Sequence, residues 1–174
     1  MNEKIKKLVV AAMLTAIGFA LSGFSFPIGA SKCFPIQHLI NVVSGVILGP
    51  AYSVLVAFCI SVLRNLAGTG SLLAFPGSMV GAFLCGMMYK YTKKLAFAYI
   101  GEVFGTAVLG GMLCYPVATM LMGKEAALFA YVLPFGVSTL GGTCIAAILL
   151  AALYRSGAMK YVRDVLGSER KSAK

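Results

Sequence analysis

Two short polar stretches interrupt an otherwise apolar chain, and each could bind a small molecule. The first contains Gln37, His38 and Asn41, and His38 is the only histidine of the chain. On a helix, Gln37 and Asn41 lie four residues apart and share a face. Amide and imidazole groups donate and accept hydrogen bonds, and inside a bilayer such groups are costly without a partner. This stretch therefore predicts part of a ligand-binding site, with a structural role for the lone histidine as the alternative.

The second polar stretch begins with Arg64 and Asn65 and continues through a glycine-rich loop. Ser71 and Ser78 supply hydroxyl groups, and Phe75 supplies an aromatic ring. The letters GTGS do not form a phosphate-binding loop, because the GK[ST] ending and a preceding strand are missing. Arg64 either extends to the outer membrane interface or faces a ligand or the loop, and the sequence leaves both interpretations open.

Two tyrosines are expected at the same depth as these polar groups. Tyr115 lies near the end of the fifth apolar segment, and Tyr131 lies near the start of the sixth. Aromatic side chains at this depth commonly anchor a helix at the membrane interface, and they could also contact a ligand. With the polar stretches, they describe a partly apolar pocket with a few polar groups, the usual composition of a small-molecule site.

Glu102 is the one acidic residue inside a predicted span, and an intramembrane carboxylate is by default a functional candidate. It lies seven residues past Leu95, which places it in the inner half of its span. We expect it to pair with Lys90, Lys93 or Lys94 at the inner surface, or to hydrogen-bond another helix. Coupling to a substrate or a proton is the alternative role.

Catalytic and metal-binding motifs are missing from the sequence. It contains no HExxH, no GxSxG, no paired carboxylates and no Walker motif, so we expect no catalytic residues and no ATP hydrolysis by the P-loop route. The five cysteines form no CxxC pair, and most lie in apolar runs. We interpret them as small hydrophobic residues and expect neither a metal site nor a cofactor.

The composition places these groups in a membrane. Hydrophobic residues make up 60% of the 174 residues and charged residues 11%, about half the charged share of a soluble protein. Long apolar segments of this kind suit lipid, where a spanning helix needs about 20 apolar residues. The sequence predicts an all-α membrane protein with a single domain and six transmembrane helices, at residues 8–26, 34–48, 51–66, 75–90, 95–122 and 126–154.

The distribution of positive charge supports six spans rather than five. Gly49-Pro50 divides an uncharged stretch that is too long for one helix, because proline breaks helices. Six spans place 12 Lys and Arg residues on one side and 3 on the other, whereas five spans divide them 10 against 5. Basic residues gather on the cytoplasmic side, so both termini are predicted to be cytoplasmic. The net charge of +10 is then a topology signal and not a nucleic-acid patch.

Small residues predict where helices approach closely. Ala12, Ala16 and Ala20 form a smooth strip along the first helix, and glycines at 77, 81, 101 and 105 have the same spacing. We expect the glycines to pack inside the bundle, whereas the alanine strip could face another helix or an external partner. The basic tail, 155–174, could form a short helix on the inner surface or remain frayed.

Three stretches resemble a known family: the alanine strip, the run PIQHLINVVSGVILGPAYSVLVAF at 35–58, and the run RNLAGTGSLLAFPGSMVGAFLCGMMY at 64–89. They are similar to the S components of energy-coupling factor (ECF) transporters, most closely to the ThiW family, which is linked to the thiazole precursor of thiamine. The resemblance implies a six-helix, multi-pass subunit in a prokaryotic plasma membrane. It also implies capture of the precursor, hydroxyethyl-thiazole, from outside.

The same resemblance implies partners. A transmembrane coupling protein and two cytoplasmic ATPases would drive uptake, and the alanine strip would be the docking face for the coupling protein. Phe75 or Tyr131 could stack on the thiazole ring. Its nitrogen and hydroxyl could be met by Gln37, His38, Asn41, Asn65 and Ser71. Two other functions stay open: a self-sufficient proton-coupled carrier that uses Glu102, and a membrane assembly subunit without a ligand.

Overall fold

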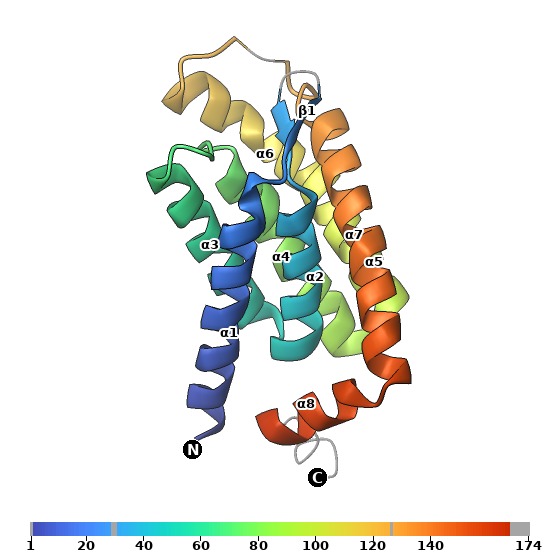
Figure 1. The fold of residues 1–174 in the computed structure, drawn as a ribbon. Coiled ribbons are helices and arrows are strands. Elements are labelled where there is room, and N and C mark those ends of the chain that lie inside the picture. The colour runs from blue at the N-terminus through green and yellow to red at the C-terminus, as the bar shows by residue number, and fades with distance from the viewer. Residues whose placement is uncertain (1, 29–30, 126, 168–174) are drawn as a thin grey trace.

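The apolar segments of the chain fold as helices that pack side by side in one bundle (Figure 1). The computed structural model describes residues 2–28, 31–125 and 127–167. Within these residues, three helical stretches are long and apolar enough to cross a membrane: Glu3–Gly23, Leu95–Leu121 and Val132–Arg155. Two shorter apolar helices are α2 (Pro35–Leu48) and α3 (Pro50–Leu66), and α4 spans Ala74–Thr92. The number of spans and the cytoplasmic location of the termini stay predictions.

Helix α2 is the central element of the bundle. It packs against α3, α4 and α7 (Val132–Arg155), and ten of its 14 residues are buried. At about 1.5 Å per residue it is about 21 Å long, shorter than the hydrocarbon core of about 30 Å. Because neighbouring helices surround it, its polar side chains face protein and not lipid.

The Gly49-Pro50 dipeptide ends α2 and begins α3, so the predicted helix break is confirmed. Gly49 has a φ of 88°, in the left-handed region that favours glycine. Pro50 occupies the first turn of α3, where a proline needs no hydrogen-bond donor. Gly86 of α4 lies against this turn, and a Cβ there would be 2.6 Å from Cα of Pro50.

Glycines bring α4 into close contact with the helical stretch that follows it. This stretch comprises α5 (Leu95–Phe104), a π-helical segment η2 (Gly105–Gly110), α6 (Gly111–Pro116) and a second π-helical segment η3 (Val117–Leu121). A Cβ on Gly105 would lie 2.9 Å from Cα of Gly81, and one on Gly110 would lie 2.7 Å from Cα of Gly77. The expected internal packing of these glycines is confirmed.

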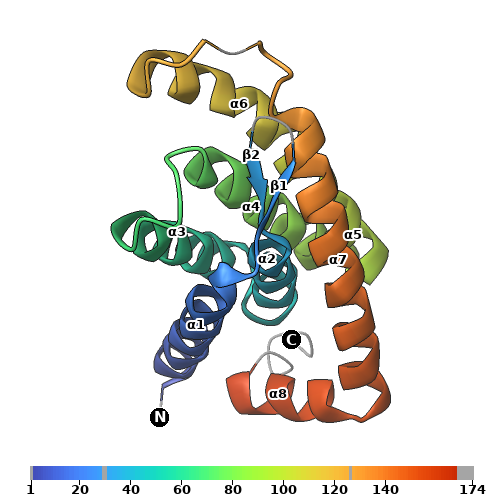
Figure 2. The same ribbon diagram turned by 45° about the horizontal axis from the view of Figure 1, so that its top comes forward.

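A short hairpin at one end of the bundle departs from the all-α prediction. Helix α1 (Glu3–Ala20) ends in a 3-10 turn, η1 (Leu21–Gly23), and the chain then forms strands β1 (Phe26–Ile28) and β2 (Ser31–Cys33) (Figure 2). The helical part of the predicted first span therefore ends at Gly23, and residue 26, the predicted end of the span, lies in β1. Phe26 pairs with Cys33, and Pro27 pairs with Lys32.

The hairpin is fixed to α7. The Cys33 thiol donates to the carbonyl of Pro134 at 3.2 Å, and the backbone N–H of Phe34 donates to Ser138 Oγ at 2.7 Å. Burial raises the pKa of the Cys33 thiol, which keeps its proton available for this hydrogen bond. These two hydrogen bonds fix the segment that leads into α2 against α7.

Helix α8 (Ala158–Leu166) lies across the opposite end of the bundle (Figure 1). Its Met159 and Leu166 are buried, and Lys6 Nζ of α1 donates to the carbonyl of Val165 at 2.9 Å. Of the two alternatives for the basic tail, the short helix therefore holds for residues 158–166, while 168–174 lie outside the described residues. Helix α7 begins at Val132, later than the predicted start at 126.

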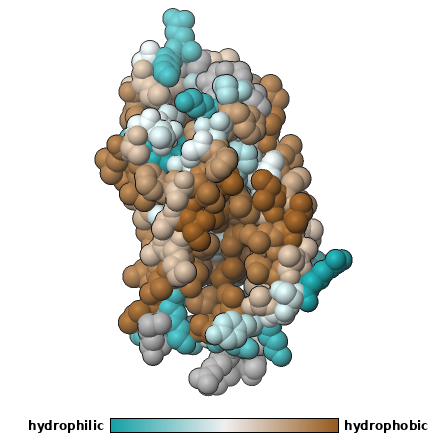
Figure 3. All heavy atoms as spheres, in the orientation of Figure 1, coloured by the Kyte–Doolittle hydropathy of each residue, from teal (hydrophilic) through white to brown (hydrophobic). Residues whose placement is uncertain are grey.

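The surface matches a location in lipid. In the view of Figure 3, hydrophobic side chains cover the middle of the molecule and hydrophilic ones gather at its two ends. Large apolar residues are exposed on α1, α3 and α7, among them Met13, Phe58 and Ile148. Such faces suit the hydrocarbon core of a bilayer.

Candidate functional site

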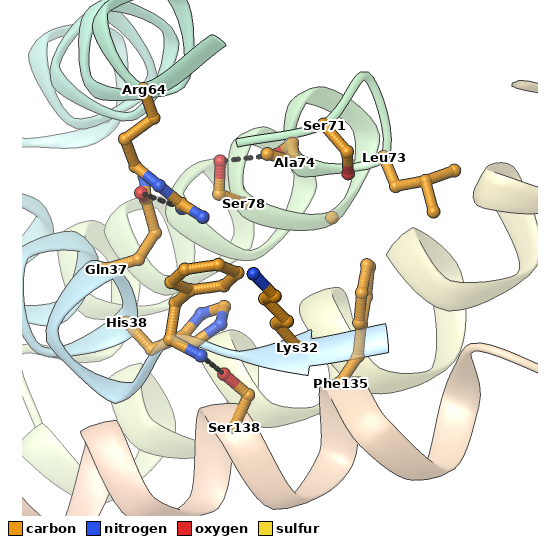
Figure 4. A pocket seen from close by; sticks show the side chains of 12 residues that line it. Lys32, Gln37, His38, Arg64, Ser71, Leu73, Ala74, Ser78, Phe135 and Ser138 are labelled. Carbon is orange, nitrogen blue, oxygen red and sulfur yellow. Dashed lines mark hydrogen bonds between the residues drawn. The ribbon is translucent and has the colours of Figure 1, made fainter. Parts of the chain in front are cut away.

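A pocket opens at the hairpin end of the bundle, between the first turns of α2, the end of α3, the start of α4 and the start of α7 (Figure 4). The empty space between its walls is about 410 Å³, including space open to solvent. Its wall is partly aromatic and partly polar, and two of its residues are cationic. The lining residues are Lys32, Phe34, Gln37, His38, Arg64, Ser71, Leu73, Ala74, Gly77, Ser78, Phe135 and Ser138.

A buried hydrogen-bond network lies directly behind His38. The Nδ1 atom of His38 lies 2.9 Å from Oε1 of Glu102, which is fully buried. The same oxygen accepts from Asn41 Nδ2 at 3.0 Å and from Thr106 Oγ1 at 3.2 Å. Because this oxygen already accepts from two other donors, we assign the shared proton to Nδ1 of His38. Nε2 is then the ring nitrogen left to a ligand.

Glu102 therefore hydrogen-bonds another helix, which confirms one of the two expectations for this residue. The other expectation, pairing with a lysine at the inner surface, is wrong: within the described residues, its one basic partner within 4.0 Å is His38. The missing side chain of Gly81 leaves the necessary room, since a Cβ there would lie 2.0 Å from Thr106 Oγ1 and 3.0 Å from Glu102 Oε2.

Arg64 is buried at the end of α3, with 2% of its surface exposed. Its Nη1 donates to Gln37 Oε1 at 3.0 Å, and its guanidinium carbon lies 3.5 Å from the ring centroid of Phe34. Its carbonyl accepts from the N–H groups of Thr69 and Gly70, which fixes the loop. Of the two interpretations of Arg64, the extended surface conformation is excluded, because the side chain faces the pocket (Figure 4).

The other predicted polar residues divide between the pocket wall and its supports. Ser71 and Ser78 line the pocket, and Ser78 Oγ donates to the carbonyl of Ala74 at 2.8 Å. Asn65 instead donates to the carbonyls of Ser61 and Ser71, at 2.8 and 3.1 Å, and so holds the loop. Asn41, which also donates to the Ser78 carbonyl, lies behind His38 and not in the pocket wall.

The three predicted aromatic residues lie outside this pocket. Phe75 packs against Phe58 with ring centroids 5.7 Å apart, and Tyr131 is buried against Phe135 at 6.3 Å. Tyr115 is 38% exposed. These residues have the expected depth but point to other sides of their helices, so they cannot stack on a ligand in this pocket.

The rings of the pocket come from residues that the sequence reasoning did not select. Phe34 and Phe135 line it, and Lys32 and Ser138 add polar groups. Phe135 lies one helical turn after Tyr131, so a helical periodicity search from Tyr131 could have found it. Lys32 depends on the hairpin, for which the sequence offered no signal beyond Pro27.

The predicted docking strip is accessible. Ala12, Ala16 and Ala20 are all exposed on α1. Ala12 and Ala16 border an apolar groove between α1 and α3, whose other wall includes Leu55 and Phe58. The alanines therefore do not pack inside the bundle.

An apolar helical bundle with a polar pocket at one end is the architecture of a membrane protein that holds a small molecule. A solved structure described as "Structure and mechanism of the S component of a bacterial ECF transporter" has the same fold, with a TM-score of 0.68 and 22% sequence identity. The match covers 89% of this chain and 96% of that one. Comparison with curated protein sequences gives no match.

The sequence places the chain more specifically. Residues 8–156 match the family described as "Thiamine-precursor transporter protein (ThiW)", and the chain belongs to this family. The family match thus places the chain among thiamine-precursor transporter proteins, and its apolar helices fit a membrane location.

Proposed function

We propose that the pocket at the hairpin end captures the thiazole precursor of thiamine, with hydroxyethyl-thiazole as the parent compound, from outside a prokaryotic plasma membrane. The observation that carries the proposal is a wall combining two rings, Phe34 and Phe135, with the polar groups of Gln37 and His38. A flat heteroaromatic ring suits aromatic walls. Its nitrogen and substituents need a few directed hydrogen bonds.

We further propose that uptake is driven by partners: a transmembrane coupling protein and two ATPases. The sequence has no P-loop of its own. Ala12, Ala16 and Ala20 are exposed on α1 beside an apolar groove. Small residues allow a second helix to approach closely in lipid, so this face suits a transmembrane partner.

Binding is tested by titrating the purified chain in detergent with the thiazole, the pyrimidine half of thiamine, and thiamine. We expect the thiazole to bind, and His38→Ala to weaken it about tenfold, because one good hydrogen bond contributes about 1 kcal/mol or more. Tyr115→Phe, an exposed residue outside the pocket, is the matched control and should bind as the wild type does. Undiminished affinity in both His38→Ala and Gln37→Ala would remove this pocket as the site.

Docking is tested separately from binding. Ala16→Leu should reduce uptake in cells that contain the partner subunits, because the larger side chain separates the two helices, while the titration stays unchanged. A self-sufficient carrier needs no partner, so its uptake should not change in Ala16→Leu. Uptake by this chain alone in vesicles, abolished by Glu102→Gln, would replace the proposed partnership.

A further inference from the structure

We propose that the pocket takes its thiamine precursor in an anionic form, with a carboxylate or phosphate group held by Arg64 and Lys32. This inference rests on the proposed function and specifies the chemical class of its ligand. Hydroxyethyl-thiazole itself is neutral. A monophosphate ester of its hydroxyl, or a carboxylate on the ring, would provide the oxyanion.

The hydrogen-bond donors of Arg64 carry the argument. Among the described residues, neither Nε nor Nη2 of Arg64 has a hydrogen-bond partner, although both atoms are buried. Nη1 is occupied by Gln37. Nε and Nη2 lie along one edge of the guanidinium plane and form the fork that binds a carboxylate or phosphate through two parallel hydrogen bonds. Phe34 covers a face of this plane and leaves its edge as the direction for an acceptor.

A third unpartnered donor lies beside the fork. Gln37 accepts from Arg64 through Oε1, and its Nε2 has no partner within the part of the chain that the structure describes. The pocket wall thus presents three buried N–H groups that need acceptors, from two residues in direct contact. Leaving each of them unpaired costs about 1–3 kcal/mol. A ligand rich in acceptor oxygens is their natural complement.

The charges around the pocket point to the same class of ligand. Within residues 2–28, 31–125 and 127–167, no carboxylate lies within 4.0 Å of Arg64 or Lys32, and the one close acid–base contact is between His38 and Glu102. Burying an arginine without a counter-ion is costly. Lys32 of β2 extends into the same space (Figure 4). Two cations without an acid leave a positive pocket that an oxyanion would neutralise.

The arrangement also suggests how such a ligand would lie. The oxyanion would meet Arg64 and Lys32, while the ring would lie toward Phe135 and His38, which line the same pocket. Because Phe34 covers one face of the guanidinium plane, the oxyanion would approach the fork of Arg64 along its edge. The backbone of Phe34 is fixed at both its polar groups: its N–H donates to Ser138 Oγ, and its carbonyl accepts from the N–H of Gln37.

The test compares ligands that differ in charge. The purified chain in detergent is titrated with hydroxyethyl-thiazole, its monophosphate ester, methylthiazole carboxylate and inorganic phosphate. We expect at least one anionic thiazole to bind about tenfold or more tightly than the neutral one. Arg64→Gln should reduce that preference about tenfold and change the neutral affinity little. The matched control is Arg155→Gln, because Arg155 is exposed at the end of α7 that lies away from the pocket.

Each outcome decides between the claims. Equal affinity for neutral and anionic thiazoles in the wild type would overturn the inference while leaving the proposed function intact. Inorganic phosphate binding as tightly as the ester would also overturn it, because the ring would then contribute nothing. If no thiazole binds in any form, the proposed function itself fails. Should Arg64→Gln not fold, the salt dependence of wild-type affinity replaces it: the anionic preference should fall as salt rises, and a preference independent of salt refutes the charge argument.

Discussion

Replacing Glu102 by glutamine isolates the contribution of one buried charge to the bundle. Glu102 is fully buried, and its Oε1 hydrogen-bonds His38 and Asn41 of α2 and Thr106 of the adjoining π-helical segment. Glutamine has nearly the same shape, and its carbonyl can accept the same three bonds. What is lost is the charge that strengthens them. Glu102→Ala removes the acceptor altogether and leaves three buried donors.

The expected magnitudes differ between the two variants. A hydrogen bond to a charged group contributes about 1.5–3 kcal/mol, and a neutral one about 0.5–1.5 kcal/mol. Glu102→Gln should therefore lower the free energy of unfolding by about 1 kcal/mol for each of the three bonds, or about 3 kcal/mol in all. Removing one partner of a buried pair costs about 3–5 kcal/mol, so Glu102→Ala should be more severe. For a chain of this size, 1 kcal/mol corresponds to about 2–4 °C in melting temperature.

These differences are measured by thermal unfolding in detergent, with the loss of the monomeric elution peak after heating as the readout. Glu125→Gln, the same substitution at an exposed loop position, should leave the melting temperature unchanged. A double-mutant cycle with His38→Ala should give a coupling energy of about 1–3 kcal/mol. A Glu102→Gln variant that melts with the wild type would refute the view of Glu102 as the acceptor that joins α2 to α5.

Two further predictions concern packing at other points of the bundle. Gly110→Ala should lower the melting temperature, because its Cβ would lie 2.7 Å from Cα of Gly77 and such overpacking costs about 1–3 kcal/mol. Gly136→Ala is the control, since its Cβ meets only an ordinary contact at 3.8 Å. Equal melting temperatures of the two variants would contradict the close approach of the helices. Arg163→Ala should raise amide hydrogen exchange in α8 about tenfold, because Arg163 donates to the hydroxyls of two tyrosines on α4 and α7. Lys160→Ala, on the exposed side of α8, should leave this exchange unchanged, and equal exchange in both variants would refute the role of Arg163.

The break between α2 and α3 was the most predictable feature of the fold, because local chemistry determines it. Proline at the first turn and glycine before it fix the α2–α3 junction, and both are visible in the letters Gly49-Pro50. The hairpin was not predicted, because its two strands of three residues have no extended alternating pattern. Such short elements depend on contacts with α7 that a single sequence does not display.

The sequence predicted the level of the bundle at which the site residues lie, but not the side of each helix on which their side chains project. Gln37, His38 and Arg64 could be selected because a buried polar group among apolar residues is conspicuous wherever it points. The aromatic residues could not be placed in this way. Helices α4 and α7 are apolar around most of their circumference, so the pattern does not reveal which side faces the interior. This is why Phe75 and Tyr131 were selected where Phe135 lines the pocket.

Apart from the hydroxyls of Thr139 and Thr143 on α7, the unpartnered buried side-chain atoms of the described residues separate into two layers with different consequences. Those that line the pocket, on Gln37 and Arg64, are all donors, whereas those behind His38, Asn41 Oδ1 and Glu102 Oε2, are both acceptors. A ligand at the pocket can satisfy the first layer but cannot reach the second through the imidazole ring. Substitutions in the front layer should therefore act on affinity and its dependence on charge, and substitutions in the rear layer on stability. Because His38 belongs to both layers, it is the one residue through which ligand binding can be coupled to the packing of α2 against α5.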